Sequence, residues 1–198
     1  TGAAVGASLA GMRPIVVHPR MDFMIYAMDS IVNQAAKWSH MFGGQASPCL
    51  TVRSIINRGG EQGAQHSQAL HSIFNHIPGL KIIAPSNAYD VKGLLNSAIQ
   101  DPNPVVFIDD RFLYSKSCNV PSEYYQLPLG EANIIKEGID ITIVSSSYLI
   151  NEARDAVLML NKEGLQSELI DLRSIKPLDI KLIIKSVKKT GVLLIVDS

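Results

Sequence analysis

A histidine follows a glycine-rich turn in the stretch RSIINRGGEQGAQHSQALHSIF, residues 53–74. The apolar run before the turn is typical of a strand, and we expect a helix to begin near His66. Glycines let a ligand or another chain approach the backbone closely. Free amide groups at a helix mouth favour an anion or a neutral imidazole, so His66 could donate to an acyl or phosphate oxygen, or relay a proton. The simpler alternative is a histidine that caps the helix.

An aromatic residue, Phe23, lies between a short β-branched strand pattern, RPIVVHP at residues 13–19, and a long predicted helix. An exposed ring at this position could form a stacking face for a heteroaromatic ligand. A phenylalanine packed in the core is the commoner alternative.

The segment SAIQDPNP, residues 97–104, predicts the end of a helix, because Pro102 cannot continue it. The last carbonyls of that helix then lack amide partners. A monovalent cation or a water cluster could satisfy these carbonyls, with a charge from Asp101 and a carbonyl from Asn103. Plain fraying at the helix end is the simpler alternative.

Strand and helix patterns alternate along the chain, and these elements must position the three candidate sites. Strands are predicted at residues 13–19, 49–56, 80–85, 104–109, 140–147, 166–173 and 192–196, with a weaker one at 132–138. Helices are predicted at residues 3–10, 24–40, 67–76, 88–100, 149–162 and 178–189.

This alternation predicts an α/β fold with two successive, mostly parallel sheets flanked by helices. We expect a first domain at residues 1–115, a linker at 116–128, where the periodicity is lost, and a second domain at 129–198. Ligands of such sheets bind beyond the carboxyl ends of the strands, where the glycine turn lies.

Composition argues against several classes of partner. The 198 residues carry 18 basic and 18 acidic side chains, which predicts no nucleic-acid or membrane-surface partner. No apolar run is long enough to cross a bilayer, and the two cysteines favour a reduced, intracellular setting. The chain opens on TGAAVG, already a helix pattern, and closes on the strand pattern GVLLIVDS, so we expect a piece of a longer protein.

The segments GAQHSQAL and HIPGLKIIAPSNAYDVKGLLNSAIQDPNPVVFID closely resemble the beta subunit of thiamine-diphosphate-dependent 2-oxo acid dehydrogenases. MDFMIYAMDSIVNQAAKW and LIDLRSIKPLD resemble further signatures of that subunit, in the same order. The resemblance implies a transketolase-like pyrimidine-binding fold, here without its N-terminal strand, and then a truncated transketolase C-terminal domain.

The resemblance also implies roles for individual residues. An aromatic residue at the position of Phe23 packs on the aminopyrimidine ring of the cofactor, with Tyr26 beside it. The histidine of QHSQ, here His66, faces the channel where the 2-oxo acid and the lipoyl group react. A structural potassium ion is expected at one set of residues: Leu50, Ala98, Ile99, Asp101 and Asn103.

The reaction implied is oxidative decarboxylation of a 2-oxo acid with acyl transfer to lipoamide. The implied partners are an alpha subunit, in an alpha2beta2 heterotetramer, and the lipoyl domain of the acyltransferase component. The alpha subunit would hold magnesium and the diphosphate of thiamine diphosphate. The family's catalytic glutamate would lie upstream of TGAAVG, so we expect the 198-residue piece alone to be inactive. The expected location is the bacterial cytoplasm or the mitochondrial matrix.

Three departures from the family pattern leave the substrate's acyl chain open. Tyr26 stands where pyruvate dehydrogenases usually carry glutamine, Ser30 replaces a second glutamine, and His18-Pro19-Arg20 replaces a more apolar run. Two alternatives therefore remain. One is a transketolase-like aldehyde transferase split over two chains, and the other is a degenerate, non-catalytic binding domain.

Overall fold

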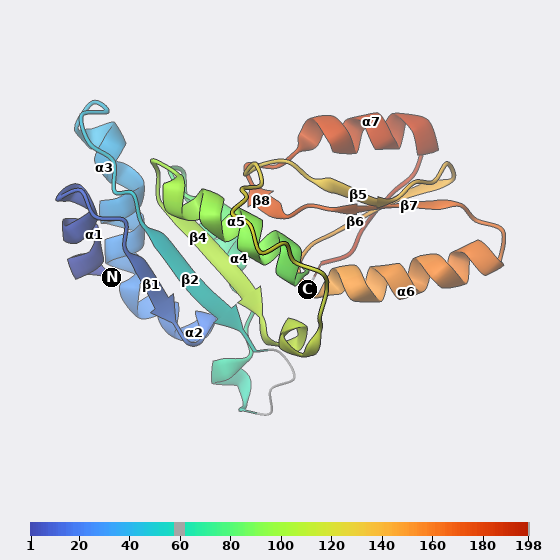
Figure 1. Ribbon diagram of the computed structural model, residues 1–198, viewed down its shortest axis with the longest axis horizontal. Helices are drawn as coiled ribbons and strands as arrows, with labels where there is room; N and C mark the ends of the chain where they lie inside the picture. Colours follow the sequence, from blue (N-terminus) through green and yellow to red (C-terminus); the bar gives the residue numbers. More distant parts are fainter. Residues whose placement is uncertain (58–61, 198) are drawn as a thin grey trace.

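The computed structural model describes residues 1–57 and 62–197 as two α/β halves in chain order (Figure 1). The first half contains α1 (Gly2–Leu9), β1 (Ile15–His18), α2 (Met21–Met24), η1 (Ile25–Ala27), η2 (Asp29–Ala35), α3 (Ala36–Met41), β2 (Thr51–Ile56), η3 (Ala64–His66), α4 (His71–His76), β3 (Lys81–Ile83), α5 (Ala88–Gln100), β4 (Val105–Asp110) and η4 (Arg111–Ser115). The second half contains β5 (Asn133–Lys136), β6 (Ile141–Ser145), α6 (Leu149–Lys162), β7 (Ser167–Asp171), β8 (Ser174–Lys176), α7 (Ile180–Thr190) and β9 (Leu193–Ile195).

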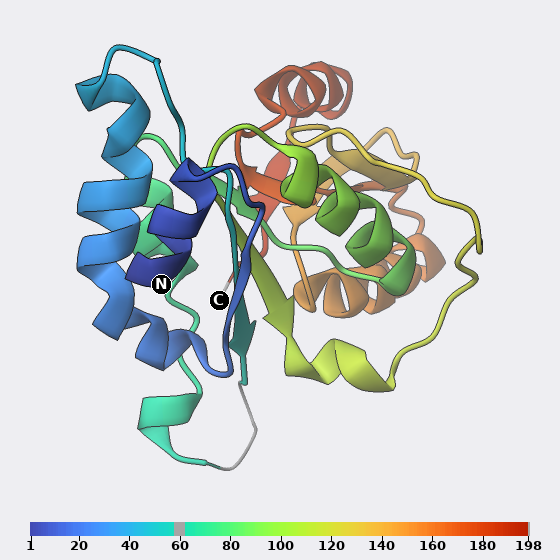
Figure 2. The ribbon, with the colours of Figure 1, turned by 60° about the vertical axis from the view of Figure 1, so that its left-hand side comes forward.

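The first sheet has the strand order β1-β2-β4-β3-β8, and its first four strands are parallel. All of β4 is buried, because helices cover both faces of the sheet there. Figure 2 shows α5 on one face and the helices of residues 2–41 on the other. Leu94 of α5 packs on Phe107, whereas Met24 and Phe74 belong to the core on the opposite face.

The second sheet has the strand order β5-β7-β6-β9. Strand β6 pairs in parallel with β7 and β9, and β5 is antiparallel to β7. Helices α6 and α7 lie on opposite faces of this sheet (Figure 1). Each helix buries one apolar stripe, so Val157 of α6 packs near Leu169, and Ile183 of α7 packs near Ile170. The predicted fold class, two mostly parallel sheets flanked by helices, is confirmed.

Two helix predictions were wrong in detail. The predicted helix at 24–40 consists of short 3-10, π and α segments, and the predicted helix at 67–76 begins only at His71. His66 instead ends the 3-10 turn η3, so it is not at a helix mouth and does not cap a helix. The chain between η3 and α4 is held by a tertiary contact, in which the backbone N–H of Gln68 is bonded to the side chain of Asp22.

Strand β8 joins the two halves, which the sequence did not indicate. It comes from the second half of the chain but pairs with β3 in antiparallel fashion. Lys176 of β8 also donates to the carbonyls of Asn75, at 2.9 Å, and Ile77, at 2.8 Å. The connecting residues 116–132 form no helix or strand, yet Tyr125 stacks on Tyr89 of α5 with 4.8 Å between ring centroids.

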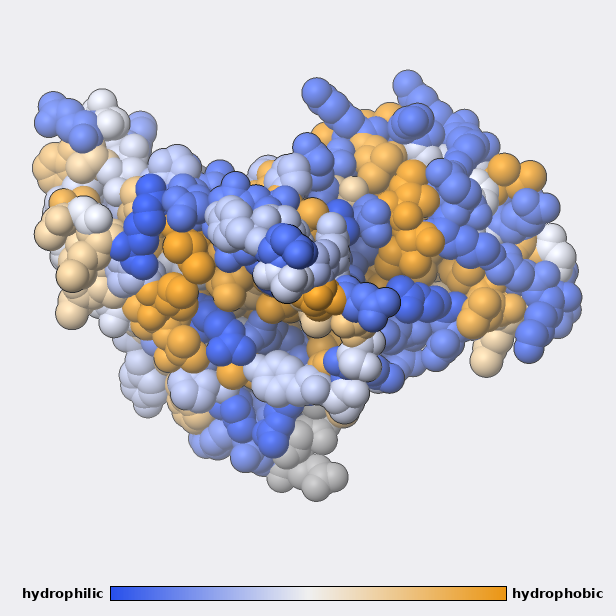
Figure 3. All heavy atoms as spheres, in the orientation of Figure 1, coloured by the Kyte–Doolittle hydropathy of each residue, from blue (hydrophilic) through white to orange (hydrophobic). Residues whose placement is uncertain are grey.

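Strand β1 is the edge of the first sheet, and one side of it is apolar and open. Ile15 and Val17 are 44% and 49% exposed. Figure 3 shows hydrophobic side chains gathered over this strand. Among the described residues, no helix is long and apolar enough to cross a membrane.

A buried carboxylate, that of Asp171, links the two halves at the end of β7. It accepts hydrogen bonds from the hydroxyl of Ser86 and from the backbone N–H of Arg173, the latter at 3.0 Å. The Arg173 guanidinium in turn pairs with Asp90 of α5 at 2.6 Å. Burial raises the pKa of Asp171 to about 6, and the nearby Asp90 adds to the rise, while the bonds from Ser86 and Arg173 oppose it.

This raised pKa predicts that stability falls as the pH rises from about 4 to above 6. In that window the folded chain holds a proton on Asp171 that the unfolded chain releases, because the ordinary pKa is 3.8. Asp171→Asn removes the charge; its one oxygen can still accept from the Arg173 amide, and its NH2 group can donate to the Ser86 hydroxyl, which also accepts hydrogen bonds. Urea unfolding should show this variant more stable at pH 7.5 by roughly 1–3 kcal/mol, with a flatter pH profile.

The control for this experiment is Asp155→Asn, because Asp155 is an exposed residue of α6. It should keep the pH profile of the unaltered chain. A loss of stability in Asp171→Asn at pH 7.5 would show that the ionised carboxylate is favourable at this position.

Candidate functional site

Phe23 and His66 lie against each other at one end of the first sheet. Their ring centroids are 5.0 Å apart, and the ring planes meet at 79°, an edge-to-face contact. Phe23 is 38% exposed, and His66 is half-buried. The structure therefore brings the two predicted site residues together on one surface, and neither ring is sealed in the core.

The strand register explains why these rings meet. Strands β1 and β2 are parallel neighbours that pair His18 with Ser54, so their carboxyl ends lie side by side. Helix α2 follows β1, and η3 comes after β2. Met21 and Met24 of α2 are fully buried, which turns Phe23 outward between them. Loops at carboxyl strand ends are where ligands of such sheets bind.

Two polar contacts join the segment around α2 to the segment around η3, one through a residue before η3 and one through a residue after it. On the buried side, Asp22 Oδ1 accepts from Gln68 N at 3.1 Å and from Gln68 Nε2 at 2.8 Å. On the exposed side, the Arg20 guanidinium donates two hydrogen bonds to Gln62 Oε1, at 3.1 and 2.7 Å. Residues 58–61 of the predicted glycine turn lie outside the described part of the chain.

Two buried polar atoms next to the ring pair have no hydrogen-bond partner among the described residues. They are His66 Nδ1 and Asp22 Oδ2. An unpaired buried polar atom costs free energy unless something else satisfies it. This orphaned nitrogen and the exposed ring of Phe23 fit a heteroaromatic ligand with polar substituents.

Tyr26 lies on η1, and its side chain is 92% exposed. Its neighbour Ile25 is 46% exposed. Together with Phe23, these residues form a partly apolar rim beside His66. The phenol of Tyr26 points away from the protein core, so it can contact only a ligand or chain that approaches from outside.

The five residues predicted to hold potassium gather at the opposite end of the sheet. They lie where α5 ends and where β2 and β4 begin: Leu50, Ala98, Ile99, Asp101 and Asn103. The Leu50 carbonyl accepts from the Val105 amide at 3.0 Å. The Asp101 carboxylate accepts from the backbone and side chain of Asn103, at 2.9 and 3.1 Å.

Two basic side chains already reach this corner. Arg13 Nη1 donates to the carbonyls of Ile99, at 2.8 Å, and Asp101, at 3.2 Å, and Lys81 pairs with the Asp101 carboxylate. Each carbonyl oxygen has a second lone pair, so the donor set of neutral oxygens and one carboxylate still fits a hard monovalent cation. The corner therefore fits the predicted ion in donor chemistry but already holds positive charge.

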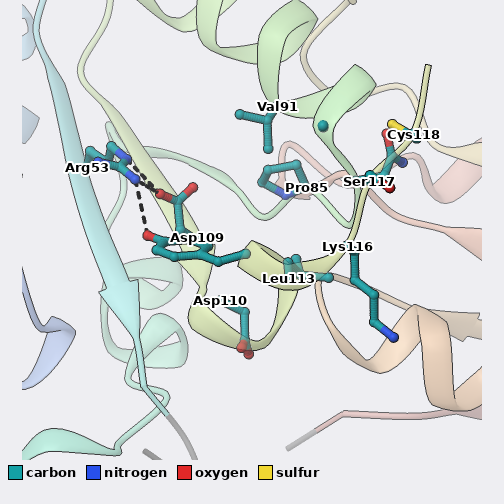
Figure 4. Close-up of a pocket in the computed structure, with 12 residues that line it drawn as sticks. Arg53, Pro85, Val91, Asp109, Asp110, Leu113, Lys116, Ser117 and Cys118 are labelled. Atoms are coloured by element: carbon teal, nitrogen blue, oxygen red, sulfur yellow. Dashed lines mark hydrogen bonds and ion pairs between the residues drawn. The ribbon is translucent and has the colours of Figure 1, made fainter. Parts of the chain in front are cut away.

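A separate cavity of about 430 Å³ opens near the carboxyl end of β4, beside the start of α5 (Figure 4). None of the predicted site residues lines it. Its walls combine apolar and polar side chains: Arg53, Pro85, Val91, Asp109, Leu113 and Lys116 are among them. It lies on the α5 side of the sheet, whereas Met21 and Met24 anchor α2 in the core of the other side.

An ion pair forms one wall of this cavity. Arg53 Nε donates to Asp109 Oδ2 at 2.6 Å, and Arg53 Nη2 donates to the Tyr114 hydroxyl at 3.2 Å. Burial raises the pKa of Asp109, and the Arg53 charge opposes that rise. Burial and the Asp109 charge both raise the pKa of Tyr114. The positive charge of Arg53 and the negative charge of Asp109 cancel, so this ion pair offers no net charge with which to bind an ionic ligand.

Sequence reasoning missed Asp22 and Gln68 at the ring pair, and Arg53 and Asp109 at the cavity. A partial signal existed for the second pair, because an arginine and an aspartate occur within two apolar strand patterns, residues 49–56 and 104–109, which the structure pairs. No comparable signal existed for Asp22 and Gln68, because their contact joins loops 46 positions apart in sequence.

Comparisons with known proteins agree with this geometry. Residues 1–116 match the family described as the transketolase pyrimidine-binding domain, and residues 130–198 match the transketolase C-terminal domain. The subunit beta of an acetoin:2,6-dichlorophenolindophenol oxidoreductase from Cupriavidus necator is 45% identical over 99% of this chain. The pyruvate dehydrogenase E1 component subunit beta of Rickettsia felis is also 45% identical over 99%.

The chain spans only 58% and 60% of the lengths of these two relatives. Among solved structures, a protein titled split gene transketolase, inactive beta4 tetramer, superimposes with a TM-score of 0.81 at 23% identity. That match covers 98% of this chain and 60% of the other, and it shows a shared fold. The predicted resemblance to beta subunits is thus confirmed, and the chain belongs to the transketolase family, as a pyrimidine-binding domain followed by a transketolase C-terminal domain.

Proposed function

We propose that this chain is part of the beta subunit of a thiamine-diphosphate-dependent 2-oxo acid dehydrogenase. The reaction would be oxidative decarboxylation of a 2-oxo acid with transfer of the acyl group to lipoamide. The observation that carries the proposal is the contact of Phe23 with His66 at the carboxyl ends of β1 and β2. The names of the 45% identical relatives, beta subunits of pyruvate dehydrogenase and of an acetoin oxidoreductase, support it.

Phe23 would hold the aminopyrimidine ring of the cofactor, with Tyr26 at the rim. His66 occupies part of the Phe23 ring through the edge-to-face contact. The part of the ring that is exposed to solvent offers the apolar surface that such stacking needs. When bound, thiamine diphosphate supplies the electron sink that makes decarboxylation of a 2-oxo acid possible. Its diphosphate and the magnesium ion would be held by the partner chain.

His66 would position the substrate or carry a proton during acyl transfer. A neutral imidazole has one donor nitrogen and one acceptor nitrogen, and Nδ1 of His66 is bonded to none of the described residues. No protein hydrogen bond therefore fixes the tautomer of the ring at Nδ1, and because Nδ1 is buried, a reactant would contact the exposed part of this half-buried ring. General acid–base catalysis by a placed histidine contributes roughly 10²–10⁴-fold.

The partner would be an alpha subunit, in an alpha2beta2 heterotetramer, and the acyl group would leave on the lipoyl domain of the acyltransferase component. The exposed rim of Tyr26 and Ile25 next to His66 supports a second chain as the other wall of the site.

The first domain would comprise residues 1–115, the linker 116–128 and the C-terminal domain 129–198. The enzyme would act in the bacterial cytoplasm or the mitochondrial matrix, since relatives come from bacteria and, in rice, from mitochondria.

Two alternatives have weaker support. A split transketolase-like aldehyde transferase would fit the split gene transketolase among the solved structures, but at 23% identity that likeness concerns the fold alone. A degenerate, non-catalytic domain would explain neither the unpaired His66 nitrogen nor the exposed Phe23. Turnover of sugar phosphates rather than 2-oxo acids by the assembled enzyme would favour the first alternative.

We further propose a structural potassium ion at the end of α5, held by Leu50, Ala98, Ile99, Asp101 and Asn103. The clustering of carbonyls around one carboxylate supports it. The role would be to fix the turn that leads from α5 into β4, and not to take part in the reaction.

Replacing His66 with alanine in the full-length enzyme, assembled with its partner chain, should reduce acyl transfer to lipoamide by about 10²-fold. The assay is 2-oxo acid-dependent acylation of an isolated lipoyl domain. His76→Ala is the matched control, because His76 is an exposed histidine at the end of α4. Equal rates in the unaltered and His66→Ala enzymes would rule out the proposed role.

Potassium should raise the thermal unfolding midpoint of the same enzyme by about 2–5 °C relative to lithium at equal ionic strength. The reason is that a bound ion stabilises only the folded state. Asp101→Asn should remove most of this difference, whereas Asp155→Asn on α6 should keep it. The same midpoint in both salts would mean that Arg13 and Lys81 alone supply the positive charge at this corner.

A further inference from the structure

We propose that Asp22 is a positioning residue for His66, acting through Gln68. This inference rests on the proposed function, because it assigns a residue that sets the geometry of the same site. Asp22 forms no hydrogen bond with either ring nitrogen of His66. It would act by holding the segment that carries His66 against α2.

The contact is part-buried and made at two points. Asp22 is 6% exposed, and its Oδ1 accepts from both the backbone and the side chain of Gln68, at 3.1 and 2.8 Å. Hydrogen bonds to a charged group contribute more than neutral ones, and more so where water is excluded. The contact therefore fixes the position and the orientation of Gln68.

The sequence positions explain why this fixes His66. Asp22 directly precedes Phe23, and Gln68 follows His66 by two residues, so the contact and the ring pair bridge the same two segments. Residues 67–70 belong to no helix or strand, so regular backbone hydrogen bonding does not hold them. Loss of the Asp22 contact would leave the ring of His66 with only its edge-to-face contact to Phe23.

One oxygen of the Asp22 carboxylate takes no part in this contact. Asp22 Oδ2 is buried, accepts no hydrogen bond from the described residues and forms no ion pair with any of them. A buried carboxylate oxygen without a partner costs free energy, and an asparagine would supply the same accepting oxygen without the charge. The inference therefore assigns the role to the two hydrogen bonds that Oδ1 accepts and not to the charge. The exposed contact between Arg20 and Gln62 ties the chain before η3, and the Asp22 contact ties the chain after it, so the two contacts hold His66 from both sides in sequence.

The test compares two half-reactions in the full-length enzyme assembled with its partner chain. Reduction of 2,6-dichlorophenolindophenol reports decarboxylation, and acylation of an isolated lipoyl domain reports acyl transfer. Asp22→Ala removes both accepted hydrogen bonds, and Asp22→Asn retains them. Asp29→Ala is the control, because Asp29 is exposed on η2 and bonds only Asn33 among the described residues.

We expect acyl transfer to fall roughly tenfold in Asp22→Ala, with dye reduction changed less than about twofold. The same imbalance should occur in His66→Ala. Asp22→Asn should stay within about twofold of the unaltered enzyme in both assays. Gln68→Ala, at an exposed residue, removes only the side-chain bond and should show the same imbalance at roughly threefold, which keeps the test valid if Asp22→Ala does not fold.

Three outcomes would overturn the inference. One is an equal fall of both rates in Asp22→Ala or Gln68→Ala, which a general loss of structure would produce. Another is an Asp22→Asn enzyme as impaired as Asp22→Ala, which would mean that the charge acts and not the accepted hydrogen bonds. The third is full acyl transfer in Asp22→Ala while His66→Ala is impaired. Full acyl transfer in His66→Ala would instead defeat the proposed function itself.

Discussion

The parallel pairing of β1 with β2 is the constraint on which the candidate site depends. Because these strands run side by side in one direction, the segments that follow them must emerge at the same edge of the sheet. Buried methionines then fix which way α2 faces, and Phe23 is left to meet His66. A slip of one residue in this register would turn the anchoring side chains of β1 to the wrong face and separate the rings.

The two edges of the first sheet carry different candidate sites. Its carboxyl edge carries the ring pair, and its amino edge carries the carbonyl cluster at the end of α5. The cluster can stabilise the turn into β4 without touching a reactant. The Arg53–Asp109 pair occupies the α5 side of the sheet, where it neutralises a carboxylate that burial would otherwise make costly. At Asp171, at the junction of the two halves, hydrogen bonds from Ser86 and Arg173 offset only part of the effect of burial, so the pKa is raised to about 6.

Much of this fold could be predicted from the sequence, because its strands are short, apolar and bounded by glycine or proline. Helix α6 has the predicted limits, since an amphipathic pattern runs without interruption to Lys162 before Gly164. The start of α4 was mispredicted because residues 64–66 form a separate 3-10 turn and residues 67–70 follow it without helical structure, which the apolar pattern does not show. Strand β8 was missed because three residues carry too little pattern to show which sheet they join. Phe23 and His66 were identified by their place after strands, whereas the residues that hold them depend on distant contacts.

The central claim is that Phe23 and His66 form one wall of a cofactor site that a second polypeptide completes. Calorimetric titration with thiamine diphosphate and magnesium tests it most directly, on residues 1–198 alone and on the full-length chain assembled with its partner. We predict little or no binding by residues 1–198, and binding by the assembly that Phe23→Ala weakens. Tight binding by residues 1–198 alone, or undiminished affinity in the Phe23→Ala assembly, would contradict the account.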